Sequence, residues 1–395
     1  MQKKLLAIAV AGALAPAAAM AQSTVEIYGR ANVGVDQWQA KGSNVAGGNH
    51  DSRLRVFDVG SRLGFRINEN LGGGMRAFVV METGVNIDSG TNLGQSGTVN
   101  GSSGFWASRD SYAGIGGAWG DVRFGRQSPF YGNGVIMQAG SNYINTAMDS
   151  AFSFGGPVGS PSGREPNVVS YNSPTFGGFN ASLSWGPGAA TGSEGAAFTG
   201  TGQKKEQVMA VTARYTGGPI RAQADWAERS NTGNIENRDR SGWKVGLGWA
   251  YAPGSQISAI YGEIEFKNVA ATQIGGVGQG ALAGNSPSVP ITIVNWEHMF
   301  GQFQVIAQYA MWGEIEGLGA DPGNTDAQGY TLAAKYHLSK RTGIYLSYSK
   351  IDNKDNAFWD MSNAGFSSAN AGGVLNNGNR GADPQVFALG LMHNF

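Results

Sequence analysis

The last segment of the chain has the pattern of a β-strand with one apolar face. Between Gln385 and Phe395, the side chains of Phe387, Leu389 and Leu391 alternate with smaller or polar residues and fall on the same face as Phe395. A soluble domain would cover such a face with another layer of structure. A strand in a membrane barrel instead leaves this face in contact with lipid. The pattern therefore predicts an outer-membrane β-barrel.

The start of the chain has the features of a secretory signal peptide. Two lysines precede an apolar stretch over residues 5–15, and Ala19-Met-Ala21 supplies small residues at the cleavage positions. The apolar stretch is shorter than the roughly 20 residues of a membrane-spanning helix. We expect cleavage after Ala21, which leaves residues 22–395 as one barrel domain.

Composition supports an exported barrel. The chain has 63 glycines and no cysteine, so its stability cannot come from disulfides and must come from backbone hydrogen bonds and packing. It carries 28 basic and 28 acidic side chains, and loss of the two lysines with the signal peptide leaves a formal charge of −2. Nothing in this balance indicates nucleic acid as a partner.

Alternation with period two begins directly after the predicted cleavage site. Val25, Ile27, Ala31, Val33 and Val35 alternate with the polar residues Glu26, Tyr28, Arg30, Asn32 and Asp36. Between residues 57 and 67 the same pattern predicts one apolar face with Phe57, Val59, Leu63, Phe65 and Ile67, opposed by Asp58, Arg62 and Arg66. One face suits lipid and the other suits water.

Short turns and long polar segments follow one another strictly along the chain. The turns lie at residues 69–74, 116–120, 173–178, 216–219, 252–255, 300–302 and 339–342. The longer segments lie near 39–53, 85–107, 128–166, 186–206, 229–241, 267–290, 313–328 and 350–384. Seven short and eight long connections join sixteen antiparallel strands. The asymmetry is typical of short periplasmic turns opposite long extracellular loops.

A sixteen-stranded barrel has a lumen too wide for side chains to fill, so it forms an aqueous channel unless a loop narrows it. The third long segment, near 128–166, is the longest and is rich in Gly, Ser, Asn and Pro. We expect this loop to fold inward and form the constriction.

Several stretches give the chain a resemblance to the trimeric general porins of Gram-negative bacteria, in particular the beta-proteobacterial type. They are Val25-Glu-Ile-Tyr-Gly29, Ser61-Arg-Leu-Gly-Phe65, Glu69-Asn-Leu-Gly-Gly-Gly-Met-Arg-Ala77, Arg109-Asp-Ser-Tyr-Ala-Gly114, Gly120-Asp-Val-Arg-Phe-Gly-Arg-Gln127, Tyr171-Asn-Ser-Pro-Thr-Phe-Gly-Gly-Phe179 and His393-Asn-Phe395. These stretches occur in order and span the predicted mature chain.

The resemblance implies a homotrimer in outer-membrane lipid of a Gram-negative bacterium. It also implies passive diffusion of ions and small hydrophilic solutes, through an eyelet where basic wall residues face an acidic third loop. In that family the terminal Phe is read by the barrel assembly machinery, and Phe395 is the matching position.

Alternation places basic side chains on the predicted pore wall: Arg30, Arg62, Arg66, Arg76 and Arg123. Arg126 breaks parity, and the resemblance at 125–127 brings it to the eyelet only if a bulge or strand end intervenes. One interpretation is a functional basic ladder that concentrates anions. The other is that Glu26, Asp58 and Glu82 bind these arginines. In the third loop, Asp149 and Glu165 are acidic and Arg164 is basic, so we expect a weakly anion-favouring pore.

Other functions have less support. His50-Asp51-Ser52 lies in a loop and is a weak match to a nucleophilic site. We find no metal-ligand spacing and no phosphate-binding glycine motif, so we expect neither an enzyme nor a cofactor. An adhesin or receptor would use the long loops near 85–107 and 350–384, and a substrate-specific channel would need a lumen ladder of aromatic or basic residues. Both alternatives stay open.

Overall fold

One antiparallel sheet makes up the described structure and closes on itself. The computed structural model describes residues 23–85, 87–88, 106–129, 163–187, 204–234, 236–268, 286–317, 323–360, 375 and 377–395. Its strands are β1 (Thr24–Lys41), β2 (His50–Asp58), β3 (Arg62–Gly72), β4 (Met75–Gly84), β5 (Ser111–Gly117), β6 (Gly120–Gln127), β7 (Glu165–Asn172), β8 (Phe179–Gly186), β9 (Gln207–Gly217), β10 (Ile220–Ser230), β11 (Asp239–Ala252), β12 (Ser255–Lys267), β13 (Ser288–Phe300), β14 (Phe303–Trp312), β15 (Ala327–His337), β16 (Thr342–Asn353) and β17 (Asp383–Asn394).

Two short 3-10 helices, η2 (Thr232–Asn234) and η3 (Asn377–Asn379), lie in the long connections. In the part of the chain that the structure describes, no helix is long and apolar enough to span a membrane.

The predicted barrel of sixteen strands is confirmed, although the second strand is divided into two segments. Both β2 and β3 pair with β1, one with each half of its length, so together they occupy one position in the barrel. Each later strand pairs with its neighbours in sequence, and β17 pairs with β1 to close the ring. Closure leaves no open edge, as a structure in lipid requires.

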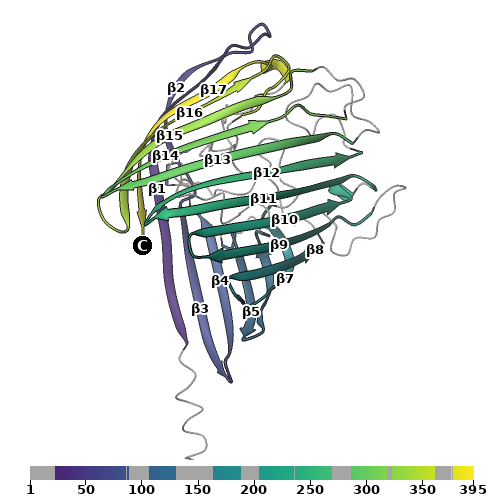
Figure 1. The fold of residues 1–395 in the computed structure, drawn as a ribbon, viewed down its shortest axis with the longest axis vertical. Coiled ribbons are helices and arrows are strands. Elements are labelled where there is room, and N and C mark those ends of the chain that lie inside the picture. Colours follow the sequence, from purple (N-terminus) through teal and green to yellow (C-terminus); the bar gives the residue numbers. More distant parts are fainter. Residues whose placement is uncertain are drawn as a thin grey trace, which may run out of the picture.

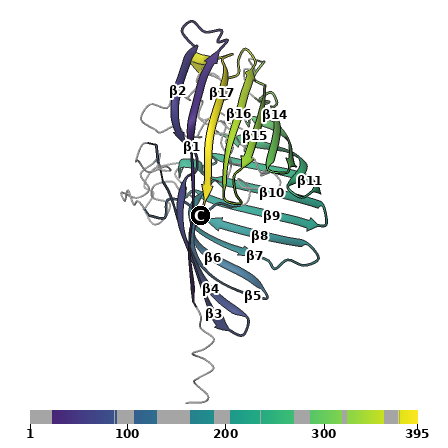
Figure 2. The same cartoon turned by 90° about the vertical axis from the view of Figure 1, so that its left-hand side faces the viewer.

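The strands are strongly tilted, and the two sides of the barrel therefore cross in projection. In Figure 1, β1, β3 and β4 run steeply while β9 to β13 run almost across the view. Figure 2 shows β1 between β2 and β17 at the seam of the barrel, with the C-terminus beside it. The seven predicted short turns join the expected hairpins and lie at one end of the barrel, and the strand ends that the eight long connections join lie at the other.

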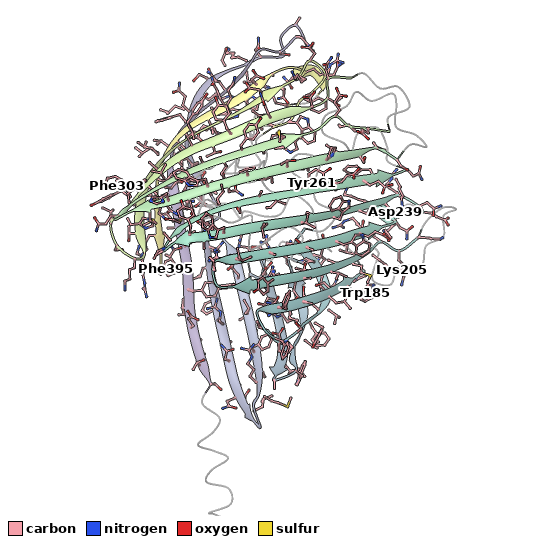
Figure 3. All side chains as sticks on the ribbon, in the orientation of Figure 1. Trp185, Lys205, Asp239, Tyr261, Phe303 and Phe395 are labelled. Atoms are coloured by element: carbon pink, nitrogen blue, oxygen red, sulfur yellow. The ribbon has the colours of Figure 1, made fainter. Side chains whose placement is uncertain are left out.

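The apolar face predicted for the last strand is turned outward. Phe387, Leu389 and Leu391 are exposed, whereas the alternating Val386 and Ala388 are buried on the inner side. Figure 3 shows Phe303 and Phe395 near the turn end of the barrel, and Lys205 and Asp239 near the loop end. The outer surface is thus apolar along the strands and polar at the loop end, as a lipid-facing barrel requires.

The alternation predicted across residues 57–67 is wrong in its first part. Phe57 is 1% exposed and Val59 is 6% exposed on the inner side of the sheet, whereas Leu63 and Phe65 pair with outward residues of β1. Asp58 lies opposite the outward Val33 of β1 but is itself 1% exposed, because it accepts hydrogen bonds from the backbone of Ser61 and Ile87. The cause is an extra residue in the break between β2 and β3, which reverses the faces of the strand.

An apolar cluster covers part of the inner wall at the loop end. Members of β12 to β17 and of β1 pack with side chains from two long connections, and all are buried: the cluster includes Trp38, Ile264, Phe266, Ile291, Ile293, Trp312, Ile315, Ile351, Phe358, Trp359, Leu375 and Val386. The ring of Trp359 stacks on Trp312, with centroids 5.5 Å apart. The inner wall at this end is therefore covered by packed apolar side chains.

Candidate functional site

A group of arginines gathers on the inner face of the early strands, and we call it the arginine wall. Cross-strand pairing puts Arg30, Arg62, Glu82 and Arg76 on the same face of β1, β3 and β4. The group consists of Arg30, Arg62, Arg66, Arg76, Arg109, Arg123, Arg126 and Arg164, with the carboxylates Glu26, Glu82, Asp110 and Asp121.

Glu82 is the centre of the first part of this wall. Its carboxylate lies 2.5 Å from Nε of Arg109 and 3.6 Å from Nε of Arg62, and it accepts a hydrogen bond of 3.1 Å from the Tyr28 hydroxyl. Burial lowers the pKa of Arg109 from its ordinary value, and the like charge of Arg164 acts in the same direction. An arginine nonetheless stays protonated in proteins, so the charge of this cluster is fixed.

Arg66 lies further toward the turn end. Its Nη1 donates to Glu26 at 2.6 Å, and its guanidinium lies over the Tyr28 ring at 4.5 Å from the centroid. The Arg66 and Glu26 side chains are 44% and 58% exposed, so this ion pair is solvated and contributes little to stability.

Asp121 has a similar central role on the neighbouring strands. Its carboxylate lies 2.6 Å from Nε of Arg123 and 3.8 Å from Nη2 of Arg76. The Phe78 ring lies between these two guanidinium groups, at 5.0 Å from Arg76 and 5.9 Å from Arg123. The Tyr112 ring contacts Arg123 from the next strand, at 5.1 Å. Carboxylate and ring contacts together hold both arginines against the wall.

The register shift beside Arg126 lies on the neighbouring strand. From Gly125 to Gln127, β6 advances two residues while β7 goes back three, from Val168 to Glu165. Arg126 itself keeps its regular pairing with Ser111 of β5, so its expected place at the eyelet stays a prediction. Nε of Arg126 donates to the Ser108 carbonyl oxygen at 3.1 Å. At the barrel seam, Nε of Arg30 donates to Oδ1 of Asn394 at 2.9 Å.

Asp110 contacts both sides of the third long connection. Its Oδ1 accepts hydrogen bonds of 2.8 Å from Oγ of Ser128 and from Nε of Arg164. Glu165 lies apart from this contact, because its carboxylate forms an ion pair with Arg229 of β10. Asp149 lies outside the described residues, as does most of the predicted constriction loop, so the inward fold of that loop stays a prediction.

The structure shows carboxylates beside most of the predicted pore-wall arginines, and the functional interpretation of the ladder stays a prediction. Arg62, Arg66, Arg76 and Arg123 do contact carboxylates. Among the described residues the group holds eight arginines and four carboxylates, a surplus of four positive charges. Asp58, the third expected partner, accepts backbone hydrogen bonds from Ser61 and Ile87 instead.

Sequence reasoning missed Arg109, Asp110 and Asp121, although Asp121 has the same strand parity as Arg123 and was identifiable on that basis. It also missed Lys335 of β15. The Lys335 stem crosses Gly343, where a Cβ atom would lie 2.6 Å from its Cε.

Water reaches the arginine wall more than it reaches the opposite wall. The Arg76 side chain is 55% exposed, whereas those of Lys244 and Asp225 across the barrel are 3% and 1% exposed. No group of three or more His, Asp or Glu side chains within the described ranges is arranged to hold a metal ion. A closed transmembrane barrel with a charged, wetted inner wall defines a channel protein of the outer membrane.

Comparison with known proteins gives the family. The Gram-negative porin family profile matches residues 7–356. Outer membrane porin protein 32 of Delftia acidovorans is 28% identical over 375 residues, which cover 90% of this chain and 91% of the relative. A solved anion-selective porin from Comamonas acidovorans superposes with a TM-score of 0.65 at 23% identity, covering 95% of this chain and all of that one. The trimer form of OmpT from Vibrio cholerae superposes with a TM-score of 0.58 at 14% identity, with 94% and 99% coverage.

The chain belongs to the Gram-negative porin family. It is an outer-membrane protein that forms a water-filled channel for passive diffusion. The predictions of family, barrel class, location and channel function are confirmed.

Proposed function

We propose that this porin favours anions over cations. The observation that carries the proposal is the surplus of four positive charges on the arginine wall, on the side of the lumen where side chains are most exposed. A surplus of one sign on a channel wall raises the local concentration of counter-ions and their rate of entry. The Delftia relative is a porin, and the Comamonas structure is described as anion-selective, which agrees with this proposal.

Liposome swelling tests the proposal with three solutes of similar size. Gluconate, glucose and N-methylglucamine carry charges of −1, 0 and +1 on nearly the same carbon skeleton. We expect gluconate to enter faster than N-methylglucamine, with glucose between them. Equal rates for the two ions would contradict an anion preference, and no entry of glucose would contradict a diffusion channel of this width.

We further propose that the channel is a homotrimer. The outward faces of β1 and β2 carry some of the most exposed apolar side chains: Val25, Ile27, Leu54 and Val56 are 65%, 61%, 78% and 66% exposed. An apolar patch suits lipid and a second subunit equally, and OmpT is a trimer in one of its solved forms. Light scattering in detergent tests this, because the trimer has three times the protein mass of the monomer.

Three further predictions belong to the same account. Residues 1–21 form a cleaved signal peptide, the third loop narrows the pore through Asp149, Arg164 and Glu165, and Phe395 is read by the barrel assembly machinery. The position of Phe395 at the outer surface, 47% exposed, supports the last of these. N-terminal sequencing of the exported protein tests the cleavage after Ala21.

A further inference from the structure

The break between β2 and β3 changes which residues of the second strand face the pore. Along β1, the pairing advances three residues from Arg30 to Val33, while the partner strand goes back four residues, from Arg62 to Asp58. One extra residue therefore lies in the break. Because side chains alternate with period two, the inner face carries even-numbered residues in β3 and odd-numbered residues in β2.

Hydrogen bonds hold this break in one geometry. The Val59 backbone N–H donates to the Asn32 carbonyl oxygen at 2.9 Å, and the Asn32 N–H donates to Oγ of Ser61 at 2.9 Å. The Ser61 N–H donates to Oδ1 of Asp58 at 3.1 Å. Gly60 has a φ of 66°, a conformation that glycine adopts without steric cost. The break is a defined bulge, with its backbone groups bonded on both sides.

The bulge brings two more arginines to the inner face. Arg53 and Arg55 are odd-numbered, and they lie opposite Trp38 and Asp36, which are buried on the inner side of β1. The residues that alternate with them, Leu54 and Val56, are exposed on the outer side. Without the extra residue, one of the two arginine pairs on this strand would face lipid, where arginine is unfavourable.

Arg53 and Arg55 differ in the contacts that hold their guanidinium groups. Arg55 donates twice to Asp36, from Nε at 2.8 Å and from Nη2 at 2.7 Å, so its charge is balanced. Arg53 is exposed, its guanidinium lies over the Trp38 ring at 5.4 Å, and its Nη2 lies 3.5 Å from Nδ1 of His50. No described carboxylate lies within ion-pair distance of Arg53. Within the described part of the chain, it is thus a positive charge at the extracellular mouth without an ion pair.

We propose that the Asp58–Ser61 bulge sets the register of β2 so that this pore has a second basic site at its mouth. We call this site, formed by Arg53, the mouth station, and the arginine wall is the first station. Arg53 is the residue that first attracts entering inorganic anions and carboxylates, and Arg62 and Arg66 receive them from it. Eight residues of β1 separate the levels of Arg30 and Trp38, which lie opposite Arg62 and Arg53, about 26 Å along the strand. That is longer than the Debye length of about 10 Å at 0.1 M salt, so the two stations act separately. The role of Arg53 rests on the proposed anion preference, whereas the register does not.

Cysteine labelling tests the register, because the native chain has no cysteine. We would prepare Arg53→Cys, Leu54→Cys, Arg62→Cys and Leu63→Cys, and keep those that show the heat-dependent gel mobility of a folded barrel. A methanethiosulfonate reagent with a sulfonate group is then added to single channels in a bilayer. We expect it to change the conductance of the variants at 53 and 62 and to leave those at 54 and 63 unchanged. Reaction at 54 without reaction at 53 would overturn the bulge.

The role of Arg53 is tested by reversal potentials in a KCl gradient near 0.1 M. We expect Arg53→Gln to lower the anion-to-cation permeability ratio by about twofold. The effect should be smaller at 1 M salt, because the Debye length is shorter there. The matched control is Lys41→Gln, which removes a positive charge at the same mouth from the outer side of β1. An unchanged ratio in Arg53→Gln, or an equal change in both variants, would overturn the mouth station. A wild-type channel without anion preference would contradict the proposed function itself, and the labelling pattern would still report the register.

Discussion

The ring of Phe395 lies directly over Gly29 at the seam where the barrel closes. The Gly29 N–H donates to the Phe395 carbonyl oxygen at 3.0 Å, and the Phe395 N–H donates to the Gly29 carbonyl oxygen at 3.1 Å. A Cβ atom at position 29 would lie 2.3 Å from Cζ of Phe395 and 2.6 Å from the Arg62 carbonyl oxygen. The last residue of the chain therefore closes the sheet by packing on a position that only glycine can occupy.

Substitution of Gly29 by valine should weaken this closure. The two branches have no space beneath the Phe395 ring, and overpacking of this kind costs about 1–3 kcal/mol. The measurement is the free energy of unfolding in urea, together with the fraction that migrates as a folded barrel without heating. Gly248→Ala is the matched control, because a Cβ there has its nearest contact at 3.5 Å. Equal stability of both variants would contradict the role of Gly29.

Loss of the Asp121 carboxylate should strengthen anion preference. Asp121→Asn removes the shared partner of Arg76 and Arg123, so the surplus charge of the arginine wall rises by one. We expect the permeability ratio to move further toward anions, by about twofold at 0.1 M salt. Glu263→Gln serves as the control, since Glu263 pairs with the outward Trp243 on the lipid side of the sheet. A shift toward cations in Asp121→Asn would contradict the charge count.

The buried pair of Lys244 and Asp225 should be sensitive to loss of one partner. Lys244 Nζ lies 3.8 Å from Oδ2 of Asp225, and Asp225 also accepts hydrogen bonds of 2.6 Å from Thr212 and Gln223. Asp225→Asn leaves a buried ammonium group without its counter-charge, at a cost of about 3–5 kcal/mol. We expect Asp225→Asn/Lys244→Met to recover part of that loss in urea unfolding. A double variant no more stable than the single one would show that Lys244 is hydrated.

Trp359 should anchor its long connection to the inner wall. Besides stacking on Trp312, its Nε1 donates to the Thr325 carbonyl oxygen at 2.8 Å, and its backbone N–H donates to Oδ1 of Asn353 at 2.9 Å. Trp359→Ala should make residues 350–384 cleavable by external protease in the folded barrel, as seen in fragment masses. Trp359→Phe keeps a ring and should be cleaved more slowly. Identical cleavage in wild type and Trp359→Ala would contradict the anchoring role of Trp359.

The sequence predicted the features that depend on local periodicity. The outward face of β17 and all seven short turns follow from alternation and turn chemistry, and they locate sixteen strands. Alternation failed at Phe57 and Val59 because a single extra residue near Gly60 leaves no signal in composition. It left Arg126 open, because the register shift beside this residue falls on β7 while Arg126 keeps its regular pairing with Ser111.

The partners of the pore arginines were harder to predict. Register decides that Glu82 meets both Arg62 and Arg109, and that Asp110 meets Arg164, which lies 54 residues away in the sequence. Such contacts depend on the register between neighbouring strands of the closed barrel, which a single sequence does not show. The path of Lys335 over Gly343 depends on the absence of a side chain at one position of a neighbouring strand. Sequence reasoning thus located the basic wall and left its charge balance to the structure.

The central claim is that this porin is an open channel whose wall favours anions. The most direct test is the reversal potential and single-channel conductance of the purified protein in a planar bilayer under a KCl gradient. The account predicts large conductance steps, three per assembly, and a reversal potential on the anion side. The absence of conductance would contradict the channel, and a reversal potential on the cation side would contradict the arginine wall as the source of selectivity.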